Sequence, residues 1–297
     1  MSTVKNYLSL VKFSHTIFAM PFAMIGFVLG LINNHLVHNN AIDKLIYLSY
    51  GTKLVLVIVC MVTARSAAMA FNRYLDRHFD AKNPRTANRE IPSGIISAEN
   101  ALSFIIGSCI LFIAATYFIN PLCLYLSPVA LFVILFYSYT KRFTYLCHLV
   151  LGLGLSLAPI GAYIAVTGSF DLLPILFSLS VVFWVSGFDI IYALNDIDFD
   201  QSQQLYSIPA IVGTKKGLRI SEVFHIVSAA CVIAAGIYGG FHWLYWIGVA
   251  LFIGMLIYQH AIVKPNDLSK VNIAFMTANG IASVVFAVFV IADVLIN

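Results

Sequence analysis

Charged residues are scarce in this sequence. Only 10% of its 297 residues are Asp, Glu, Lys or Arg, whereas a soluble domain carries about 25%. Hydrophobic residues make up 61% of the chain. This composition excludes an ordinary soluble protein and indicates a polytopic integral membrane protein, and a single membrane domain is expected to occupy residues 1–297.

Cysteine motifs and biased segments are also lacking. The five cysteines are scattered, and none forms a CxxC pair. We therefore expect neither a disulfide framework nor a zinc site. The chain has no low-complexity tract and no long linker, and no nucleic-acid partner is expected.

Long apolar stretches fill most of the chain. Each suits a membrane-spanning helix of about 20 residues, and together they predict an all-α bundle of about nine transmembrane helices around a central cavity. The stretches lie near residues 16–33, 47–71, 100–118, 121–140, 145–166, 172–195, 220–239, 242–263 and 272–293.

The basic residues predict the orientation of the chain. With the N-terminus inside, the outer loops carry only Lys44 and Lys53, Arg65 lies within a predicted span, and all other cations fall on inner segments. The positive-inside rule then places the hydrophilic segments 72–99 and 196–219 on the cytoplasmic side.

One of these segments begins with Asn72, Asp76 and Asp80, which are four residues apart. Residues at this spacing share one face of a helix, where two carboxylates repel each other. A divalent cation would convert that repulsion into attraction. The surrounding cations are Arg73, Arg77, Lys82, Arg85 and Arg89. Acids beside cations predict a site for a metal ion and a diphosphate.

The other segment repeats the spacing with Tyr192, Asp196 and Asp200. Asp198 lies two residues from each aspartate, about 200° around a helix, so it is predicted to point away from the shared face. An isolated acidic pair is usually only a solvated helix end. Two such clusters at inner helix ends favour a functional site, with the two copies facing each other across the cavity.

Five sequence motifs carry a resemblance to a known family. They are NRYLDRHFD, PRTANREIPSG, YALNDIDFD, FYSYTKR and VKFSHTIFAMPFA. With these motifs the chain resembles the UbiA superfamily of membrane prenyltransferases over essentially its full length, and most closely its 4-hydroxybenzoate polyprenyltransferase branch and naphthoate-using relatives. One position departs from the pattern, because many members have Asp where this chain has Arg73.

The resemblance implies an aromatic prenyltransferase of quinone biosynthesis in a bacterial-type inner membrane. Asp76, Asp80, Asp196 and Asp200, with Asn72, would hold Mg²⁺ and act in catalysis. The metal would promote ionisation of a polyprenyl diphosphate, and the ring of a 4-hydroxybenzoate-like acid would attack the allyl cation. The prenyl tail would lie in an apolar groove open to lipid.

Two alternatives remain. A 1,4-dihydroxynaphthoate acceptor would place the protein in menaquinone biosynthesis. An ion-coupled transporter is the alternative from another class, but transporters usually place acidic groups near the bilayer midplane on broken helices, not at inner helix ends.

Other polar residues are candidates for substrate contact. Arg65 would contact substrate or, alternatively, pair with Asp189. Lys12 and His15 would bind an acceptor carboxylate or, for His15, fill the core. The remaining candidates are Asn72, Arg85, Arg89, Tyr137, Ser138, Lys141, Arg142, Asp189 and Tyr192. Tyr137, Ser138, Lys141 and Arg142 could equally be an interface anchor.

Three further cations follow the second cluster. Lys215, Lys216 and Arg219 are interpreted as part of the positive-inside pattern, with diphosphate binding as the alternative.

Overall fold

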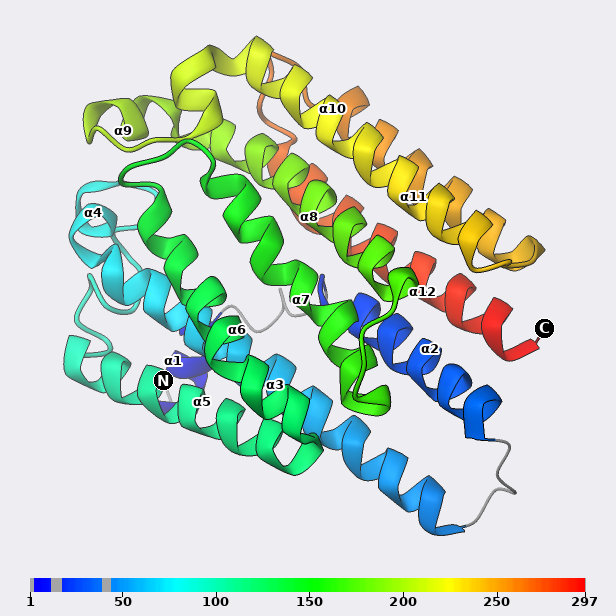
Figure 1. Cartoon of the computed structure of the whole chain (residues 1–297). Coiled ribbons are helices and arrows are strands. Elements are labelled where there is room, and N and C mark those ends of the chain that lie inside the picture. Colours follow the sequence, from blue (N-terminus) through cyan, green and yellow to red (C-terminus); the bar gives the residue numbers. More distant parts are fainter. Residues whose placement is uncertain (1–2, 12–17, 39–43, 297) are drawn as a thin grey trace.

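The chain folds into a bundle of long helices (Figure 1). The computed structural model describes residues 3–11, 18–38 and 44–296, and this part contains no β-strand. The helices are α1 (Thr3–Leu10), α2 (Met20–His38), α3 (Lys44–Leu75), α4 (Arg77–Lys82), α5 (Ala98–Ile119), α6 (Pro121–Thr140), α7 (Cys147–Thr167), α8 (Leu172–Ala193), α9 (Ile197–Ser202), α10 (Ile208–Tyr238), α11 (Trp243–Ile262) and α12 (Asn279–Ile296). A 3₁₀ turn (Leu194–Asp196) precedes α9, and a π-helix (Ile273–Ala278) precedes α12.

Eight helices in the described residues are long and apolar enough to cross a membrane. They confirm the prediction of an all-helical integral membrane protein. The first predicted span corresponds to α2, whose apolar described part, Met20–Asn34, is shorter than the other eight. The expected total of nine spans is therefore not confirmed.

Local sequence signals set the helix ends. Ser97 begins α5 by accepting a hydrogen bond from the Asn100 amide, and Asn120 caps α6 in the same way. Such side-chain caps satisfy amides that have no partner within the helix. Gly168 ends α7 with a φ of 70°, a left-handed conformation that favours glycine.

The predicted hydrophilic segment 196–219 is shorter in the structure. Ser207 caps α10, which begins at Ile208 with Pro209 in its first turn. Lys215, Lys216 and Arg219 therefore lie on a helix. Gly213, with φ 79° and ψ 168°, breaks the regular geometry of α10 just before them. The proline and the cap explain the early helix start, because both are favoured in the first turn.

The helices pack through small residues and through an aromatic core. A Cβ on Gly26 of α2 would lie 2.0 Å from the Pro159 carbonyl oxygen of α7, so only glycine permits this approach. Small residues allow membrane helices to approach closely. The core between α2, α8, α11 and α12 is built around Phe22, Trp184 and Phe252.

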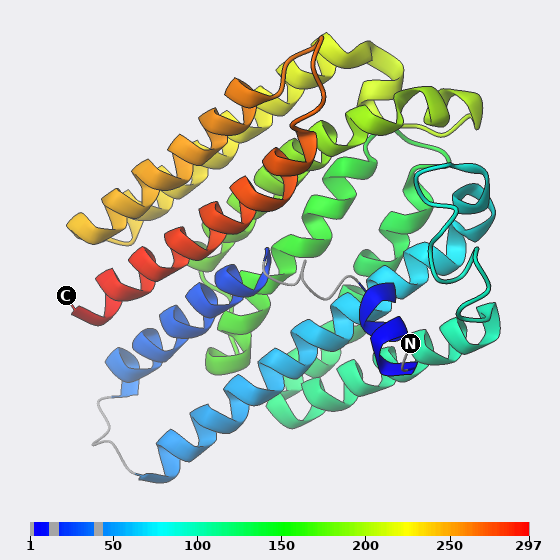
Figure 2. The ribbon, with the colours of Figure 1, turned by 180° about the vertical axis from the view of Figure 1, so that it is seen from behind.

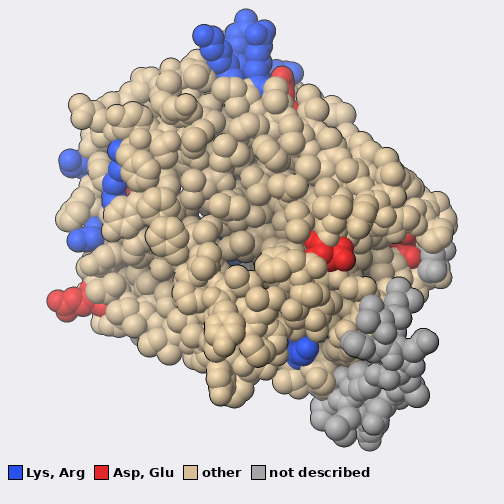
Figure 3. All heavy atoms as spheres, in the orientation of Figure 1, with Lys and Arg blue, Asp and Glu red and all other residues tan. Residues whose placement is uncertain are grey.

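The short helices α4 and α9 lie at one end of the bundle, whereas the C-terminus lies at the other (Figures 1 and 2). On the face in Figure 3, most lysines and arginines lie along the upper and left edges, the end of the bundle that holds α4, α9 and the start of α10. Uncharged residues cover most of the remaining surface. The orientation of the chain in the membrane stays a prediction.

Candidate active site

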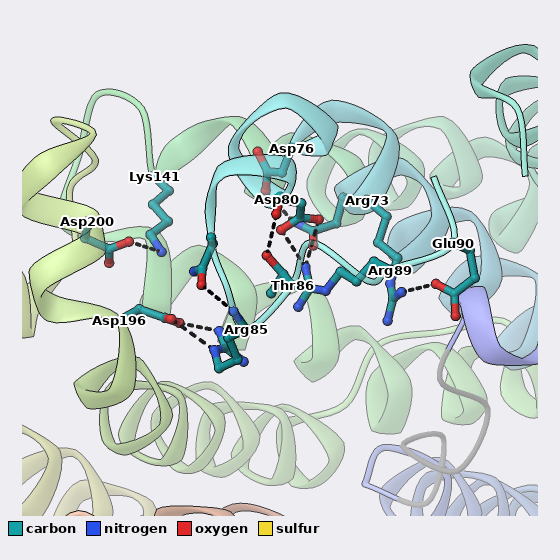
Figure 4. Close-up of polar contacts among 12 residues, drawn as sticks. Arg73, Asp76, Asp80, Arg85, Thr86, Arg89, Glu90, Lys141, Asp196 and Asp200 are labelled. Carbon is teal, nitrogen blue, oxygen red and sulfur yellow. Dashed lines mark hydrogen bonds and ion pairs between the residues drawn. The ribbon is translucent and has the colours of Figure 1, made fainter. Parts of the chain in front are cut away.

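A polar cavity of about 310 Å³ lies between the two acidic segments. Figure 4 shows side chains of both segments, and of Lys141 just after α6, turned toward one another. The structure thus brings together nearly all the predicted site residues. Those lining the cavity are Arg65, Asn72, Asp76, Asp80, Arg85, Arg89, Tyr137, Ser138, Lys141, Arg142, Asp189, Tyr192, Asp196 and Asp200.

The first acidic segment crosses a helix end. Asn72 lies in the last turn of α3, and Asp76 is the residue between α3 and α4. Asn72 donates a hydrogen bond to Asp76 Oδ2 at 3.1 Å, and Arg142 Nη2 lies 2.9 Å from Asp76 Oδ1. Burial raises the pKa of Asp76 to about 6, although the nearby Arg142 opposes that rise.

Asp80 is buried at the start of α4 and is held by its own loop. Arg89 Nη1 lies 2.9 Å from both Asp80 carboxylate oxygens. The Thr86 hydroxyl donates to the Asp80 carbonyl oxygen at 3.0 Å. These contacts fold the loop after α4 back over the carboxylate.

Arg85 of the same loop crosses to the second acidic segment. Its Nε and Nη2 donate to Asp196 Oδ1 and Oδ2 at 3.2 and 2.6 Å, and its Nη1 donates to the Tyr192 hydroxyl at 2.9 Å. This two-pronged contact is the geometry in which arginine binds a carboxylate most strongly.

Asp200 is fully buried and pairs with Lys141, whose Nζ lies 2.7 Å from Asp200 Oδ1. Ser207 donates to the other carboxylate oxygen at 3.0 Å. Burial would by itself lower the pKa of Lys141, but the Asp200 carboxylate outweighs it and raises that pKa.

Asp198, by contrast, is exposed and does not line the cavity. The chain passes through the 3₁₀ turn before α9 and still keeps Asp196 and Asp200 on the cavity side. The predicted difference in orientation between Asp198 and its two neighbours therefore agrees with the structure.

The donor set of the cavity fits Mg²⁺. Within the described residues, no three His, Cys, Asp or Glu side chains gather as a ready-made metal site. Mg²⁺, however, commonly takes one or two carboxylates and completes its shell with substrate phosphates and waters. Each acidic segment supplies two carboxylates to the cavity wall, which suits an ion shared with a diphosphate.

A second, apolar cavity of about 330 Å³ adjoins the polar one. Arg65, Met69, Tyr137, Leu151 and Leu155 line both cavities. The apolar cavity continues along α3, α5, α6 and α7 as far as Phe170, near the opposite end of α7. Arg65 stands at the junction, and its buried Nε has no hydrogen-bond partner in the described structure.

Asp189 does not pair with Arg65, so the alternative pairing is not found. Its Oδ2 lies 2.7 Å from Nδ1 of His148, a buried residue of α7 that also lines the polar cavity. His148 was not among the predicted site residues. It lies inside a predicted span, and an ionisable residue at membrane depth is a signal that could have identified it.

Arg73, the residue that departs from the family pattern, lines the polar cavity, but its partner Glu90 does not. Arg73 is buried and forms an ion pair with Glu90, which also accepts a hydrogen bond from Ser9 of α1. Glu90 was missed as well. It directly follows Arg89, so this pair anchors the loop that carries two of the cavity cations.

The π-helix before α12 supports Tyr192. Phe275 stacks on the Tyr192 ring with centroids 4.3 Å apart. The Asn279 side chain donates to the Ala274 and Phe275 carbonyl oxygens and accepts from Trp184 and Gln259. A single turn of π-helix often occurs at functional sites. Nothing in the sequence pattern signalled Phe275.

Two predicted substrate contacts, Lys12 and His15, lie outside the described residues. Lys215, Lys216 and Arg219 are exposed and do not line the cavity.

Comparison with known proteins agrees with this geometry. Two 4-hydroxybenzoate octaprenyltransferases are similar to the chain. The one from Paraburkholderia phymatum is 31% identical over 234 residues, which cover 79% of this chain and 81% of the relative. The one from Francisella tularensis subsp. novicida is 28% identical over 238 residues, 80% of this chain and 84% of the relative.

Solved structures share the fold. An apo UbiA homologue from Aeropyrum pernix K1 matches with a TM-score of 0.77 and 28% identity, covering 95% of this chain and 97% of that one. A homologue from Archaeoglobus fulgidus bound to DMAPP and Mg²⁺ matches with a TM-score of 0.72 and 19% identity, covering 98% and 100%. The model of the UbiA prenyltransferase family matches residues 41–281, and the chain therefore belongs to that family.

Proposed function

We propose that this membrane prenyltransferase transfers a polyprenyl group from its diphosphate to the ring of an aromatic acid of the 4-hydroxybenzoate kind, in quinone biosynthesis. One observation carries the proposal: a polar cavity with two pairs of aspartates adjoins an apolar cavity and shares part of its wall. A substrate with a diphosphate head and a hydrocarbon tail matches both parts. The names of the two octaprenyltransferase relatives support the same reaction class.

The cations of the cavity would bind the diphosphate. Arg85, Arg89, Lys141 and Arg142 reach the cavity from two separate segments. Each now holds one aspartate. A diphosphate shared with metal-bound aspartates would meet these cations on several sides, which fixes its orientation.

Mg²⁺ is the proposed cofactor, held by Asp76 and Asp80 with Asn72 on one side and by Asp196 and Asp200 on the other. When bound, it would neutralise charge that develops on the leaving diphosphate. The A. fulgidus homologue bound to DMAPP and Mg²⁺ supports this choice of metal. In this chain the carboxylates supply the oxygen ligands and Arg85 orients Asp196.

The apolar cavity would hold the first part of the prenyl tail. Its wall is formed by side chains such as Val57, Met61 and Ile134. These residues exclude water from the allylic carbon, so an aromatic ring rather than water attacks it.

The acceptor would bind at the junction of the two cavities. Arg65 has a buried Nε without a partner there, and a guanidinium is suited to a carboxylate. This placement fits an aromatic acid. A 1,4-dihydroxynaphthoate acceptor also carries a carboxylate and is the second candidate, whereas the shared cavity at the helix ends disfavours ion-coupled transport.

The distribution of lysine and arginine along the sequence supports a cytoplasmic active site in a bacterial-type inner membrane. Cysteines introduced at Lys82 and Gln203, in a background without the five native cysteines, should react with an impermeant thiol reagent in inverted vesicles. They should resist it in intact cells. The opposite pattern would reverse the proposed orientation.

One experiment tests the proposed reaction. Purified protein in vesicles would be incubated with Mg²⁺, a polyprenyl diphosphate and a panel of aromatic acids that includes 4-hydroxybenzoate and 1,4-dihydroxynaphthoate. We expect one prenylated product by mass spectrometry. Matched incubations without donor and with the Asp200→Ala variant serve as controls, and absence of product from every acid contradicts the proposal.

A further inference from the structure

One carboxylate of the polar cavity differs from the others. Five aspartates line this cavity, and four of them pair with a lysine or arginine: Asp76, Asp80, Asp196 and Asp200. Asp189 is held by an imidazole instead. A Lys or Arg partner favours the ionised carboxylate and makes it a weaker proton acceptor. Among the described residues that line this cavity, Asp189 is thus the aspartate whose partner carries no permanent charge.

The hydrogen bonds of His148 assign the proton on its ring. The backbone N–H of Ile208 donates to His148 Nε2 at 3.3 Å. Nε2 therefore acts as an acceptor, and the ring proton lies on Nδ1, which donates to Asp189 Oδ2 at 2.7 Å. His148 is 2% exposed and its position is fixed, whereas the Asp189 side chain is 24% exposed. The Asp189–His148 pair consequently presents a carboxylate to the cavity from a buried imidazole.

The Asp189–His148 pair also lies beside the junction of the polar and apolar cavities, where the two substrates must meet. Leu151 lies one turn after His148 on α7 and lines both cavities. The allylic carbon of a bound donor links the diphosphate to the tail, so it must lie near this junction.

We propose that Asp189 is the catalytic base that removes the ring proton, and that His148 is the residue that positions it. The inference rests on the proposed function. The allylic C–O bond breaks and its electron pair leaves with the diphosphate. A ring carbon then forms a bond to the allylic carbon. The C–H bond at that ring carbon breaks last: its electron pair restores the aromatic ring and its proton goes to Asp189. The cavity aspartates paired with cations keep their separate role at the diphosphate.

The test separates proton loss from ionisation. Wild type, Asp189→Asn and the exposed control Asp198→Asn would be compared on 4-hydroxybenzoate and its ring-deuterated form, or on the naphthoate if that is the acceptor. A donor with isotopically labelled bridging oxygen reports ionisation, because the label scrambles into non-bridging positions whenever the C–O bond breaks reversibly.

We expect Asp189→Asn to lower product formation by about 10²–10⁴-fold, the range for general-base catalysis. Any remaining turnover should show a deuterium isotope effect that wild type and Asp198→Asn lack, while scrambling in the donor persists. If no product remains, persistent scrambling alone still locates the block after ionisation. Loss of scrambling, or slow turnover without an isotope effect, overturns the assignment.

His148 provides the second variant pair. Gln retains an N–H donor and Leu does not, so His148→Leu should show the isotope effect and His148→Gln should restore part of the activity. Equal losses of activity in His148→Leu and His148→Gln would contradict a positioning role. Absence of product from wild type with every acceptor would overturn the proposed function, and this inference with it. Product from wild type with unchanged behaviour of Asp189→Asn overturns this inference alone.

Discussion

The two acidic segments look alike in sequence but are supported in different ways. Asp80 of the first segment takes Arg89 from the loop that follows it. Both aspartates of the second segment take their cations from earlier parts of the chain: Asp196 from Arg85 and Asp200 from Lys141. Equal spacing of carboxylates therefore does not imply equal electrostatic surroundings.

Two short basic segments each serve both clusters. The loop after α4 sends Arg89 to the first cluster and Arg85 to the second. The end of α6 sends Arg142 to the first and its neighbour Lys141 to the second. The basic run after the second cluster contributes nothing to the cavity, because α10 starts early and leaves that run exposed. The two acidic segments are therefore linked through shared basic segments, and the second depends on Arg85 of the first.

Removal of divalent metal should have the largest effect and should not distinguish the two segments. We expect excess EDTA to abolish prenyl transfer, because both pairs of carboxylates would lose the ion that links them to the diphosphate. Added Mg²⁺ should restore activity, and product mass measures both states. Full turnover in EDTA would exclude the proposed metal role.

Single aspartate variants come next and separate residues within the second segment. Asp196→Ala or Asp200→Ala should lower turnover by about 10²–10³-fold, the scale for losing one key electrostatic group in a transition state. Asp198→Ala is the matched control, since Asp198 is exposed, and should lose less than about tenfold, less than that scale. Turnover at saturating Mg²⁺ decides the point. An equally impaired Asp198→Ala would refute the assignment of cavity-facing carboxylates.

Periodicity explains how much of this arrangement the sequence could predict. Residues four apart share a helix face wherever a helix forms. The break at Asp76 and the 3₁₀ turn at Asp196 still leave the aspartates of both segments on the cavity side. Apolar length likewise predicted the membrane helices.

The partners of those carboxylates could not be predicted in the same way. Arg85 reaches Asp196 across 111 positions of sequence, and only the folded loop decides whether it turns to its own cluster or to the other. His148 and Glu90 act through contacts between distant segments. Loop conformation and helix packing create these contacts, and no local pattern encodes them.

Arg85, which reaches Asp196 from the loop after α4, tests whether the second segment depends on the first. Arg85→Ala should lower kcat/KM for the diphosphate donor by about 10- to 100-fold, the size of one or two hydrogen bonds to a charged group. Lys216→Ala removes an exposed cation from the second segment's own basic run and should have little effect. Steady-state kinetics with varied donor measure both. Equal losses would mean that net charge, rather than the specific pair, governs donor binding.

The Arg73–Glu90 pair should give the smallest change in activity, because it acts on the cavity through the loop. Its side chains are 3% and 11% exposed, so removing one partner leaves a buried charge. Such a loss typically costs about 3–5 kcal/mol of stability, whereas replacing both partners by apolar groups is often nearly neutral. Arg73→Met and Glu90→Leu should each lower the unfolding temperature in detergent, and the double variant should be more stable than either.

Arg73→Met and Glu90→Leu should also change the kinetics of donor binding. Glu90 adjoins Arg89, which holds Asp80 of the first cluster, so the single variants should raise KM for the donor severalfold and change kcat less. Glu99→Leu, which removes an exposed acid at the start of α5, is the control. If the two single losses of stability simply add in the double variant, the residues are not coupled. Arg73 would then have a role other than anchoring the loop that supplies cations to both acidic segments.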